Sequence, residues 1–163
     1  MRRLYLLFAL VVTASAQWLP VDQPDPTHIF SREMLAAHNQ IRARVDVSPL
    51  VWSASLAARA QEWAGHLLRQ ARFYHRPHSN FGENLFEISG AGASPADVVG
   101  DWASEARDYK YRANSCRGTC GHYTQLVWRG TSEVGCAVAR SRIREVWVCN
   151  YCPPGNWIGE RPY

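Results

Sequence analysis

Two histidines and two glutamates from separated segments are the side chains best suited to chemistry in this sequence. The set is Glu83, Glu105, His122 and either His75 or His78. Two imidazoles with two carboxylates suit a zinc ion or another divalent cation, or a pair of groups that exchange a proton. Spacing alone does not separate such a site from a plain hydrogen-bond network, because the chain has no H-E-x-x-H or G-x-S-x-G motif.

The strongest sign of a built site is the position of Glu105. Val98, Trp102, Glu105 and Tyr109 recur at helical spacing, so the glutamate falls among apolar residues on the inward face. A carboxylate there either lies at the edge of the stripe and reaches water, or needs a buried partner. We expect the partner.

Helices and a hairpin are expected to position these side chains. The predicted elements are helices beginning at N-caps Ser31, Ser53 and Ser94, a short element at His122–Trp128, and strands over residues 133–140 and 144–151. Residues 71–93 lack a period and are interpreted as a long connection. This order predicts an α+β domain with helices packed on a small antiparallel sheet.

The N-terminus is typical of export. Two arginines precede a short apolar run and an Ala-Ser-Ala site, which predicts a signal peptide over residues 1–16. An uncleaved anchor is the alternative, although the run is shorter than the roughly 20 residues of a spanning helix. Residues 17–30 contain three prolines and are expected to form an extended leader before a single domain over 31–163. The protein is therefore predicted to be secreted, either extracellular or periplasmic.

Charge and composition exclude some partners. The formal net charge is +4, and it falls to about +2 once Arg2 and Arg3 are removed with the signal peptide. That balance is too mild to indicate a nucleic acid partner. No segment after the signal peptide is apolar enough to span a membrane.

The cysteines are expected to form disulfides after export. They are Cys116, Cys120, Cys136, Cys149 and Cys152, an odd number that leaves at least one thiol over. If Arg142-Ile143 is a two-residue turn, the hairpin places Cys136 directly opposite Cys149. This register is an assumption, because neither turn residue favours such a turn, and spacing alone leaves other pairings open.

Several long motifs, in order, resemble the CAP superfamily of cysteine-rich secretory, antigen 5 and class 1 pathogenesis-related proteins. They are HNQIRARVDVSPLVW, FGENLFE, DWASEARDY, CGHYTQLVW and CNYCPPGNWIGERPY. The similarity covers about residues 32–163, and the bacterial single-domain members look most alike. It implies an α-β-α sandwich around a central antiparallel sheet flanked by helices, the SCP fold. It also implies that His38 and Arg42 are core or capping contacts.

The resemblance further implies a cavity lined by His75, Glu83, Glu105 and His122. His75 stands eight residues before Glu83, as in the family, and His78 remains the alternative. The resemblance also implies two disulfides, Cys116–Cys120 and Cys136–Cys149. It leaves Cys152 unpaired, because its family partner position is Phe81 here; Cys152 is then free, capped by glutathione, or a link to a second copy.

Three functions are consistent with such a cavity. The first is a non-catalytic binding module in which His75 and His122 hold Zn²⁺ or another divalent cation that folding does not require. The structural alternative is that the four groups only satisfy one another. The second is a carrier of a small apolar ligand such as a lipid or sterol, or a binder of an extracellular protein. The third is a metal-dependent hydrolase or protease, for which the sequence supplies no convincing nucleophile.

Overall fold

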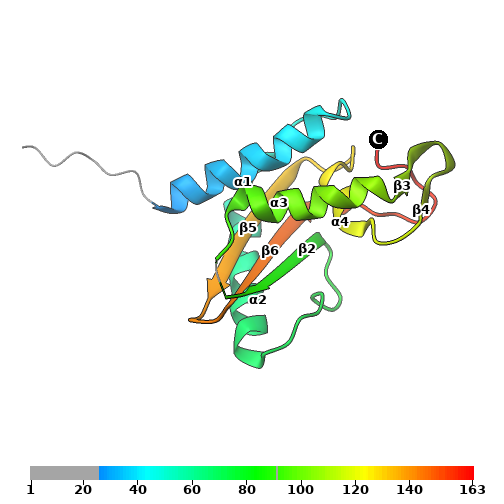
Figure 1. The fold of residues 1–163 in the computed structure, drawn as a ribbon. Coiled ribbons are helices and arrows are strands. Elements are labelled where there is room, and N and C mark those ends of the chain that lie inside the picture. The colour runs from blue at the N-terminus through cyan, green and yellow to red at the C-terminus, as the bar shows by residue number, and fades with distance from the viewer. Residues whose placement is uncertain (1–25, 91) are drawn as a thin grey trace, which may run out of the picture.

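Residues 26–90 and 92–163 are described by the computed structural model, in which helices alternate with strands (Figure 1). The helices are α1 (Pro26–Ala43), α2 (Ala54–Gln70), α3 (Pro95–Ser104) and α4 (Gly121–Leu126), with 3-10 turns η1 (Glu105–Arg107) and η2 (Tyr111–Ala113). The strands are β1 (Val51–Trp52), β2 (Gly82–Ser89), β3 (Tyr109–Lys110), β4 (Ser115–Cys116), β5 (Glu133–Arg140) and β6 (Arg144–Cys152). The predicted signal peptide, residues 1–16, and the leader as far as residue 25 lie outside the described residues.

Within the described residues, the central sheet has four strands in the order β1-β5-β6-β2. β2, β6 and β5 pair in antiparallel fashion, as predicted, whereas the short strand β1 pairs with β5 in parallel. A parallel neighbour is possible because α2 and further elements separate β1 from β5 along the chain, so no tight reversal joins them. β3 and β4 form a separate two-stranded ribbon.

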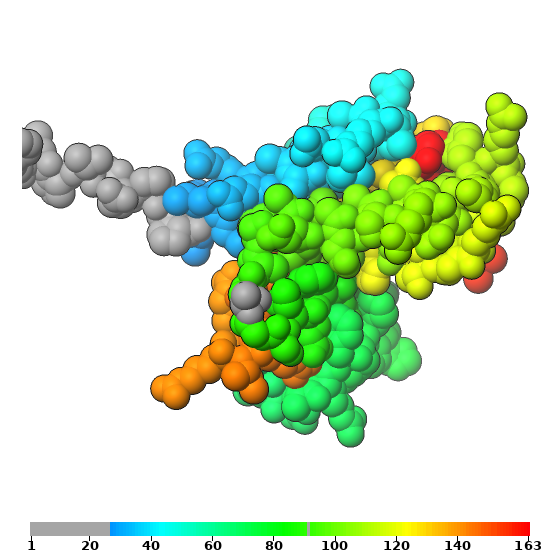
Figure 2. Space-filling model, in the orientation of Figure 1, coloured from blue at the N-terminus to red at the C-terminus, as the bar shows by residue number. Residues whose placement is uncertain are grey.

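Helices cover both faces of this sheet, which confirms the α-β-α sandwich. α2 packs on one face, where Ala60 and Leu67 meet Val146 and Val148 of β6. α1, α3 and α4 pack on the other face around Trp102 and Trp147. α1 and α3 lie side by side along this second face (Figures 1 and 2). Among the described helices, none combines the length and apolar character needed to cross a bilayer.

The β5–β6 hairpin has the predicted register. Ser141 N–H donates to the Arg144 carbonyl (2.8 Å), so Arg142-Ile143 is the two-residue turn. Cys136 therefore lies opposite Cys149, and the two form a disulfide.

Helix α1 begins earlier than predicted, so residues 26–30, which were expected in the extended leader, belong to the helix. The helix starts at Pro26, and Ser31 is an internal residue whose hydroxyl donates to the His28 carbonyl (3.1 Å). Phe30 explains the extra turn, because it packs against Trp147 with ring centroids 5.7 Å apart. Burying this ring stabilises a turn whose polar residues carry no helical signal, and proline is tolerated at the first helical position.

Strand β2 was missed, because residues 71–93 were interpreted as a connection. Its residues Gly82–Ser89 pair with β6 along their whole length. Glu83 and Asn84, at the start of the strand, interrupt the alternation of apolar and polar residues that identifies a strand in a sequence. Both side chains are hydrogen-bonded in the fold, which is what permits them there.

Candidate functional site

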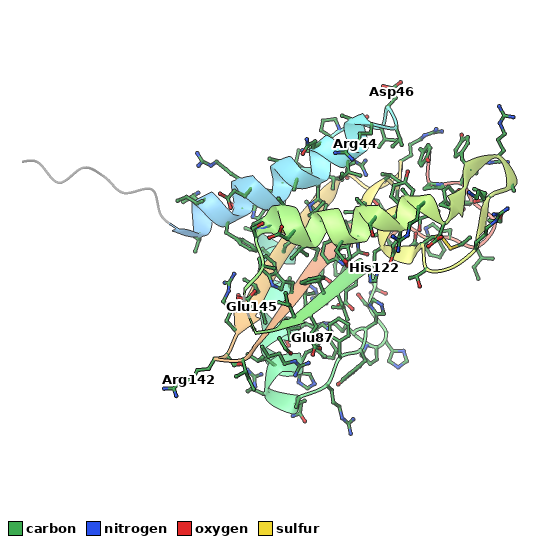
Figure 3. All side chains as sticks on the ribbon, in the orientation of Figure 1. Arg44, Asp46, Glu87, His122, Arg142 and Glu145 are labelled. Atoms are coloured by element: carbon green, nitrogen blue, oxygen red, sulfur yellow. A yellow bond between two sulfur atoms is a disulfide. The ribbon has the colours of Figure 1, made fainter. Side chains whose placement is uncertain are left out.

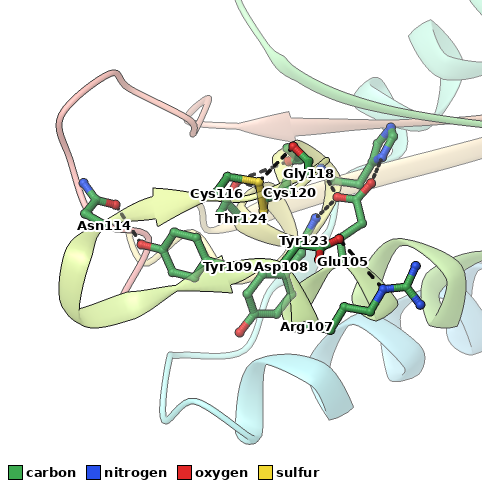
Figure 4. Close-up of a disulfide and its surroundings, with 12 residues drawn as sticks. Glu105, Arg107, Asp108, Tyr109, Asn114, Cys116, Gly118, Cys120, Tyr123 and Thr124 are labelled. Atoms are coloured by element: carbon green, nitrogen blue, oxygen red, sulfur yellow. Dashed lines mark hydrogen bonds and ion pairs between the residues drawn. A yellow bond between two sulfur atoms is a disulfide. The ribbon is translucent and has the colours of Figure 1, made fainter.

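Glu105 has a hydrogen-bond partner as expected, but a half-buried one: the His122 side chain is 28% exposed and that of Glu105 is 15% exposed. α3 ends at Ser104, earlier than its apolar stripe suggested, and Glu105 opens the 3-10 turn η1. There its Oε1 accepts from His122 Nδ1 (2.7 Å). Its Oε2 accepts the main-chain N–H groups of His122 (2.9 Å) and Tyr123 (3.1 Å). One carboxylate thus satisfies the first turn of α4 and orients the imidazole on it (Figure 4).

Both ends of α4 are fixed by other parts of the chain. The disulfide Cys116–Cys120 closes the segment immediately before the helix, and Cys120 is its N-cap residue (Figure 4). At the other end, the Arg42 guanidinium donates to the Leu126 carbonyl (2.9 Å). α4 has only six residues, so these anchors rather than its own hydrogen bonds determine where His122 lies.

Glu83 pairs with His75, not with His78. His75 Nδ1 donates to Glu83 Oε1 (2.9 Å), and the Arg76 N–H donates to the same oxygen (3.0 Å). The Glu83 side chain is 5% exposed and that of His75 is 63% exposed, so the imidazole lies at the rim above a buried carboxylate. His78 is exposed and adopts a left-handed backbone conformation (φ 54°).

The two His–Glu pairs come from elements that touch. Asn84, next to Glu83 on β2, donates from Nδ2 to the His122 carbonyl (3.1 Å). Gly82 allows this approach, because a Cβ there would stand 2.2 Å from Gln125 Oε1 on α4. Figure 3 shows His122 beside the N-terminal end of β2. The start of β2 and the start of α4 therefore form one corner of the molecule.

The four side chains nevertheless form two pairs rather than one tight cluster. Within residues 26–90 and 92–163, only His38, Cys136 and Cys149 bring three such ligand atoms within 4.8 Å of one another. The two sulfurs of that group are bonded to each other, so neither offers a thiolate to a metal. A cation at the corner would therefore be held by fewer than three of the four side chains as they stand, with water completing its shell.

The two pairs use their imidazoles in the same way. Each histidine contacts a glutamate through Nδ1, which assigns the proton to Nδ1 and leaves the lone pair on Nε2. The His122 ring is further stacked on Trp102, with centroids 6.1 Å apart and planes inclined by 21°. Glu83 Oε2 is buried and has no hydrogen-bond partner among the described residues.

His38 and Arg42 are core contacts rather than part of the corner. His38 is fully buried, with Nδ1 on the Met34 carbonyl (2.7 Å) and Nε2 on the Tyr151 hydroxyl (3.0 Å). Burial lowers the pKa of His38 to about 4, which keeps it neutral near pH 7.

Sequence reasoning overlooked Asn84 and Arg76 at the corner. The signal for Asn84 was its place beside Glu83 in FGENLFE, since a polar pair inside a β-rich run requires bonding partners. Arg76 contributes through its main chain, for which no sequence pattern exists.

The chain as a whole also matches the family to which the motifs pointed. Residues 35–151 match the family described as CAP: Cysteine-rich secretory protein family. The chain belongs to the CAP family. It is 39% identical to pathogenesis-related protein PR-1 of Medicago truncatula over 98% of this chain and 96% of that protein. It is 44% identical to pathogenesis-related leaf protein 4 of Solanum lycopersicum over 81% of this chain and 82% of that protein.

Solved structures share the fold. Venom allergen-like protein 4 of Schistosoma mansoni superposes with a TM-score of 0.68 at 25% identity, covering 82% of this chain and 92% of that one. The crystal structure of NaASP2 with Zn²⁺ superposes with a TM-score of 0.66 at 24% identity, covering 82% of this chain and 84% of that one. The curated relatives named above are plant proteins, so the expected likeness to bacterial members is not supported.

Proposed function

We propose that this CAP protein is a secreted, non-catalytic binding module whose two His–Glu pairs take up a divalent cation, Zn²⁺ first. The observation that carries the proposal is that both imidazoles are held through Nδ1 by a glutamate, which leaves each Nε2 available as a ligand. A carboxylate on the far nitrogen of a histidine fixes its tautomer and raises its basicity toward a metal.

The chemistry of the corner fits such a cation. His75 and His122 would supply neutral nitrogen ligands, which zinc accepts readily. The buried Glu83 Oε2 has no partner within the described residues, and a nearby positive charge would compensate it. A bound cation would act as a Lewis acid, but the protein groups around it serve here to orient ligands rather than to move protons.

The engagement of Glu105 favours binding over catalysis. Both of its oxygens are committed to α4, so Glu105 itself keeps no free carboxylate oxygen to act as a base. Within the described part of the chain, the carboxylate is the only hydrogen-bond partner of either imidazole, so no hydroxyl or thiol is activated by one. The hydrolase alternative requires a zinc-dependent rate of peptide or ester cleavage that Glu83→Gln abolishes.

Zinc titration of the purified protein by calorimetry tests the proposal. We expect His75→Ala and His122→Ala each to weaken binding at least tenfold, because each removes one nitrogen ligand. His78→Ala and the exposed His28→Ala control for the number of histidines and should bind like the native chain. Equal affinity in all five proteins would rule out the cation site, and loss in His78→Ala alone would transfer the role from His75 to His78.

The signal-peptide pattern at the N-terminus and the disulfides are the basis for proposing that the protein is secreted. The structure contains two disulfides, which persist in oxidising compartments. Expression in a secreting host should yield a mature protein whose first residue is Gln17. An intact Met1 on the cell-associated protein would support the uncleaved anchor instead.

Cys152 is proposed as a link between two copies. It is half-buried and unpaired, whereas the other four cysteines are paired. A dimer on a non-reducing gel that disappears in Cys152→Ser would support the link. A monomer under oxidising conditions would refute it.

An apolar ligand is the second candidate, because a groove of about 630 Å³ lies between the start of α1, α2 and β5. Phe30, Trp52 and Val138 contribute to its lining, and its volume is in the range of small-molecule sites. Ala58→Trp on α2 should fill the groove and abolish uptake of a fluorescent fatty acid. Ala36→Trp, on the exposed side of α1, should not; uptake that persists in Ala58→Trp would exclude the groove.

A further inference from the structure

His75 lies where neither regular structure nor burial can hold it. It belongs to the connection between α2 and β2, and its side chain is 63% exposed. The bond from Nδ1 to Glu83 is the one hydrogen bond that its side chain makes within the described residues. An exposed side chain on an irregular segment ordinarily samples several rotamers, which weakens any ligand it offers.

The residues on either side of His75 are both anchored on Trp63 of α2. The Tyr74 ring meets the Trp63 ring edge-on, with centroids 5.3 Å apart and planes at 88°. The Arg76 guanidinium carbon lies 4.9 Å from the centroid of a Trp63 ring. Trp63 is 8% exposed, and the His66 ring is stacked on it at 4.7 Å. The indole is therefore a rigid platform.

Polar contacts of the same two residues reinforce this attachment. The Tyr74 hydroxyl bonds His66 Nε2 (3.1 Å), and Arg76 Nη2 donates to the Arg59 carbonyl (3.0 Å). Arg76 also pairs with Glu62 at 3.3 Å, but the Glu62 side chain is 71% exposed, so solvent screens this pair. The stacking on Trp63 and the bond to the main chain of α2 are the contacts that should matter.

We call the contacts of Tyr74 and Arg76 with α2 the anchor; they affect the position of Glu83 as well as that of His75. The Arg76 N–H and His75 Nδ1 donate to the same glutamate oxygen. Any movement of the Arg76 main chain therefore changes both members of the pair.

We propose that Trp63 is a positioning residue of the cation site: by holding Tyr74 and Arg76, it fixes the backbone and tautomer of His75. This inference rests on the proposed function for its role in cation binding, but the effect on His75 exists without a cation. Trp63 touches no ligand itself and acts through the segment that carries the imidazole.

Arg76→Ala is the decisive substitution. It removes the guanidinium from Trp63 but keeps the main-chain N–H that bonds Glu83, so any change reports on the anchor. Glu62→Gln is the matched control, since it breaks the screened ion pair and leaves Arg76 on the indole. Trp63→Phe keeps an aromatic face and loses no hydrogen bond, because Trp63 Nε1 has no partner among the described residues. Trp63→Leu removes the face.

The first measurement is ¹⁵N NMR of the His75 imidazole in the metal-free protein. We expect one tautomer, protonated on Nδ1, in the native chain, in Glu62→Gln and in Trp63→Phe. Arg76→Ala and Trp63→Leu should show a mixture of tautomers. Unchanged His75 signals in folded Arg76→Ala would overturn the inference.

The second measurement is the zinc affinity of the same proteins. Arg76→Ala should lose about tenfold, as typically follows the loss of an outer-shell partner. Glu62→Gln and Trp63→Phe should stay within twofold of the native affinity. Native affinity in Arg76→Ala would overturn the role of the anchor in binding. If the native chain takes up no zinc, the proposed function fails, and the NMR result alone decides the positioning role.

Discussion

Replacing Arg42 by methionine should destabilise the protein by about 4 kcal/mol. The guanidinium donates to four carbonyls, those of Ser48 (2.7 Å), Leu126 (2.9 Å), Trp128 (3.0 Å) and Thr131 (3.0 Å). The Trp128 carbonyl keeps a second donor, the Thr131 N–H (3.1 Å). The other two buried carbonyls, on Leu126 and Thr131, would lose their donor, at about 1–3 kcal/mol each. Methionine replaces most of the aliphatic volume, so little of this loss is a cavity.

The charge of Arg42 is part of this arrangement. Burial lowers its pKa to about 10, which still leaves the side chain protonated near neutral pH. Carbonyl oxygens rather than a carboxylate receive this charge among the described residues. Arg42→Lys should lose roughly half as much stability as Arg42→Met, because an ammonium cannot reach four acceptors spread around a planar fork.

Thermal and guanidinium unfolding measure the effect. A loss of about 4 kcal/mol corresponds to a fall in Tm of roughly 12–16 °C for a domain of this size. Arg44→Met is the control, since Arg44 follows two residues later, in the turn directly after α1, and is exposed (Figure 3). If Arg42→Met cost less than about 1 kcal/mol, or no more than Arg44→Met, the orphaned carbonyls would not carry the stability assigned to them.

Three further predictions concern stability. Burial lowers the pKa of His38 from 6.5 to about 4, so as the pH falls this histidine is protonated in the unfolded chain before it is protonated in the folded one. The free energy of unfolding should therefore fall by up to about 3 kcal/mol as the pH drops from 6.5 to 4. Denaturant titrations at several pH values should show a smaller fall in His38→Gln, and an equal fall in both proteins would refute this. Gly135→Ala should destabilise the protein by about 3 kcal/mol or more, because the new Cβ would clash with the main-chain nitrogen of Ala57. Gly100 has open space around it, so Gly100→Ala should instead stabilise α3 by about 0.5–1 kcal/mol. Similar melting temperatures for the two variants would contradict this account of the packing. Replacing Cys136 and Cys149 together by alanine should cost about 3 kcal/mol in chemical unfolding, since it frees a closed loop in the unfolded chain, and an unchanged midpoint would refute that account.

The sequence predicted the elements whose signals are local. α3 begins as expected, with Ser94 and Asp97 forming a capping box around Pro95. α2 follows Ser53, and its apolar stripe is the face that packs on the sheet. These features depend on residues within one or two turns, so composition and spacing suffice to find them.

Elements that depend on distant partners were misjudged. The first turn of α1 exists because Phe30 reaches Trp147 on β6. β2 begins with polar residues whose partners lie on other elements. β1 is only two residues long and owes its existence to pairing with β5. A local pattern cannot report a contact made across the sequence, which is why these boundaries failed.

The candidate site was likewise predictable in part from local sequence and in part only from the fold. By itself, the sequence determined that Glu105 lies on an apolar face and needs a partner, and family motifs named His122, Glu83 and His75. Only the tertiary structure decided that the four side chains form two Nδ1-bonded pairs at the junction of β2 and α4. The physical reason is that hydrogen-bond geometry depends on where separate elements pack, and packing is a property of the whole chain.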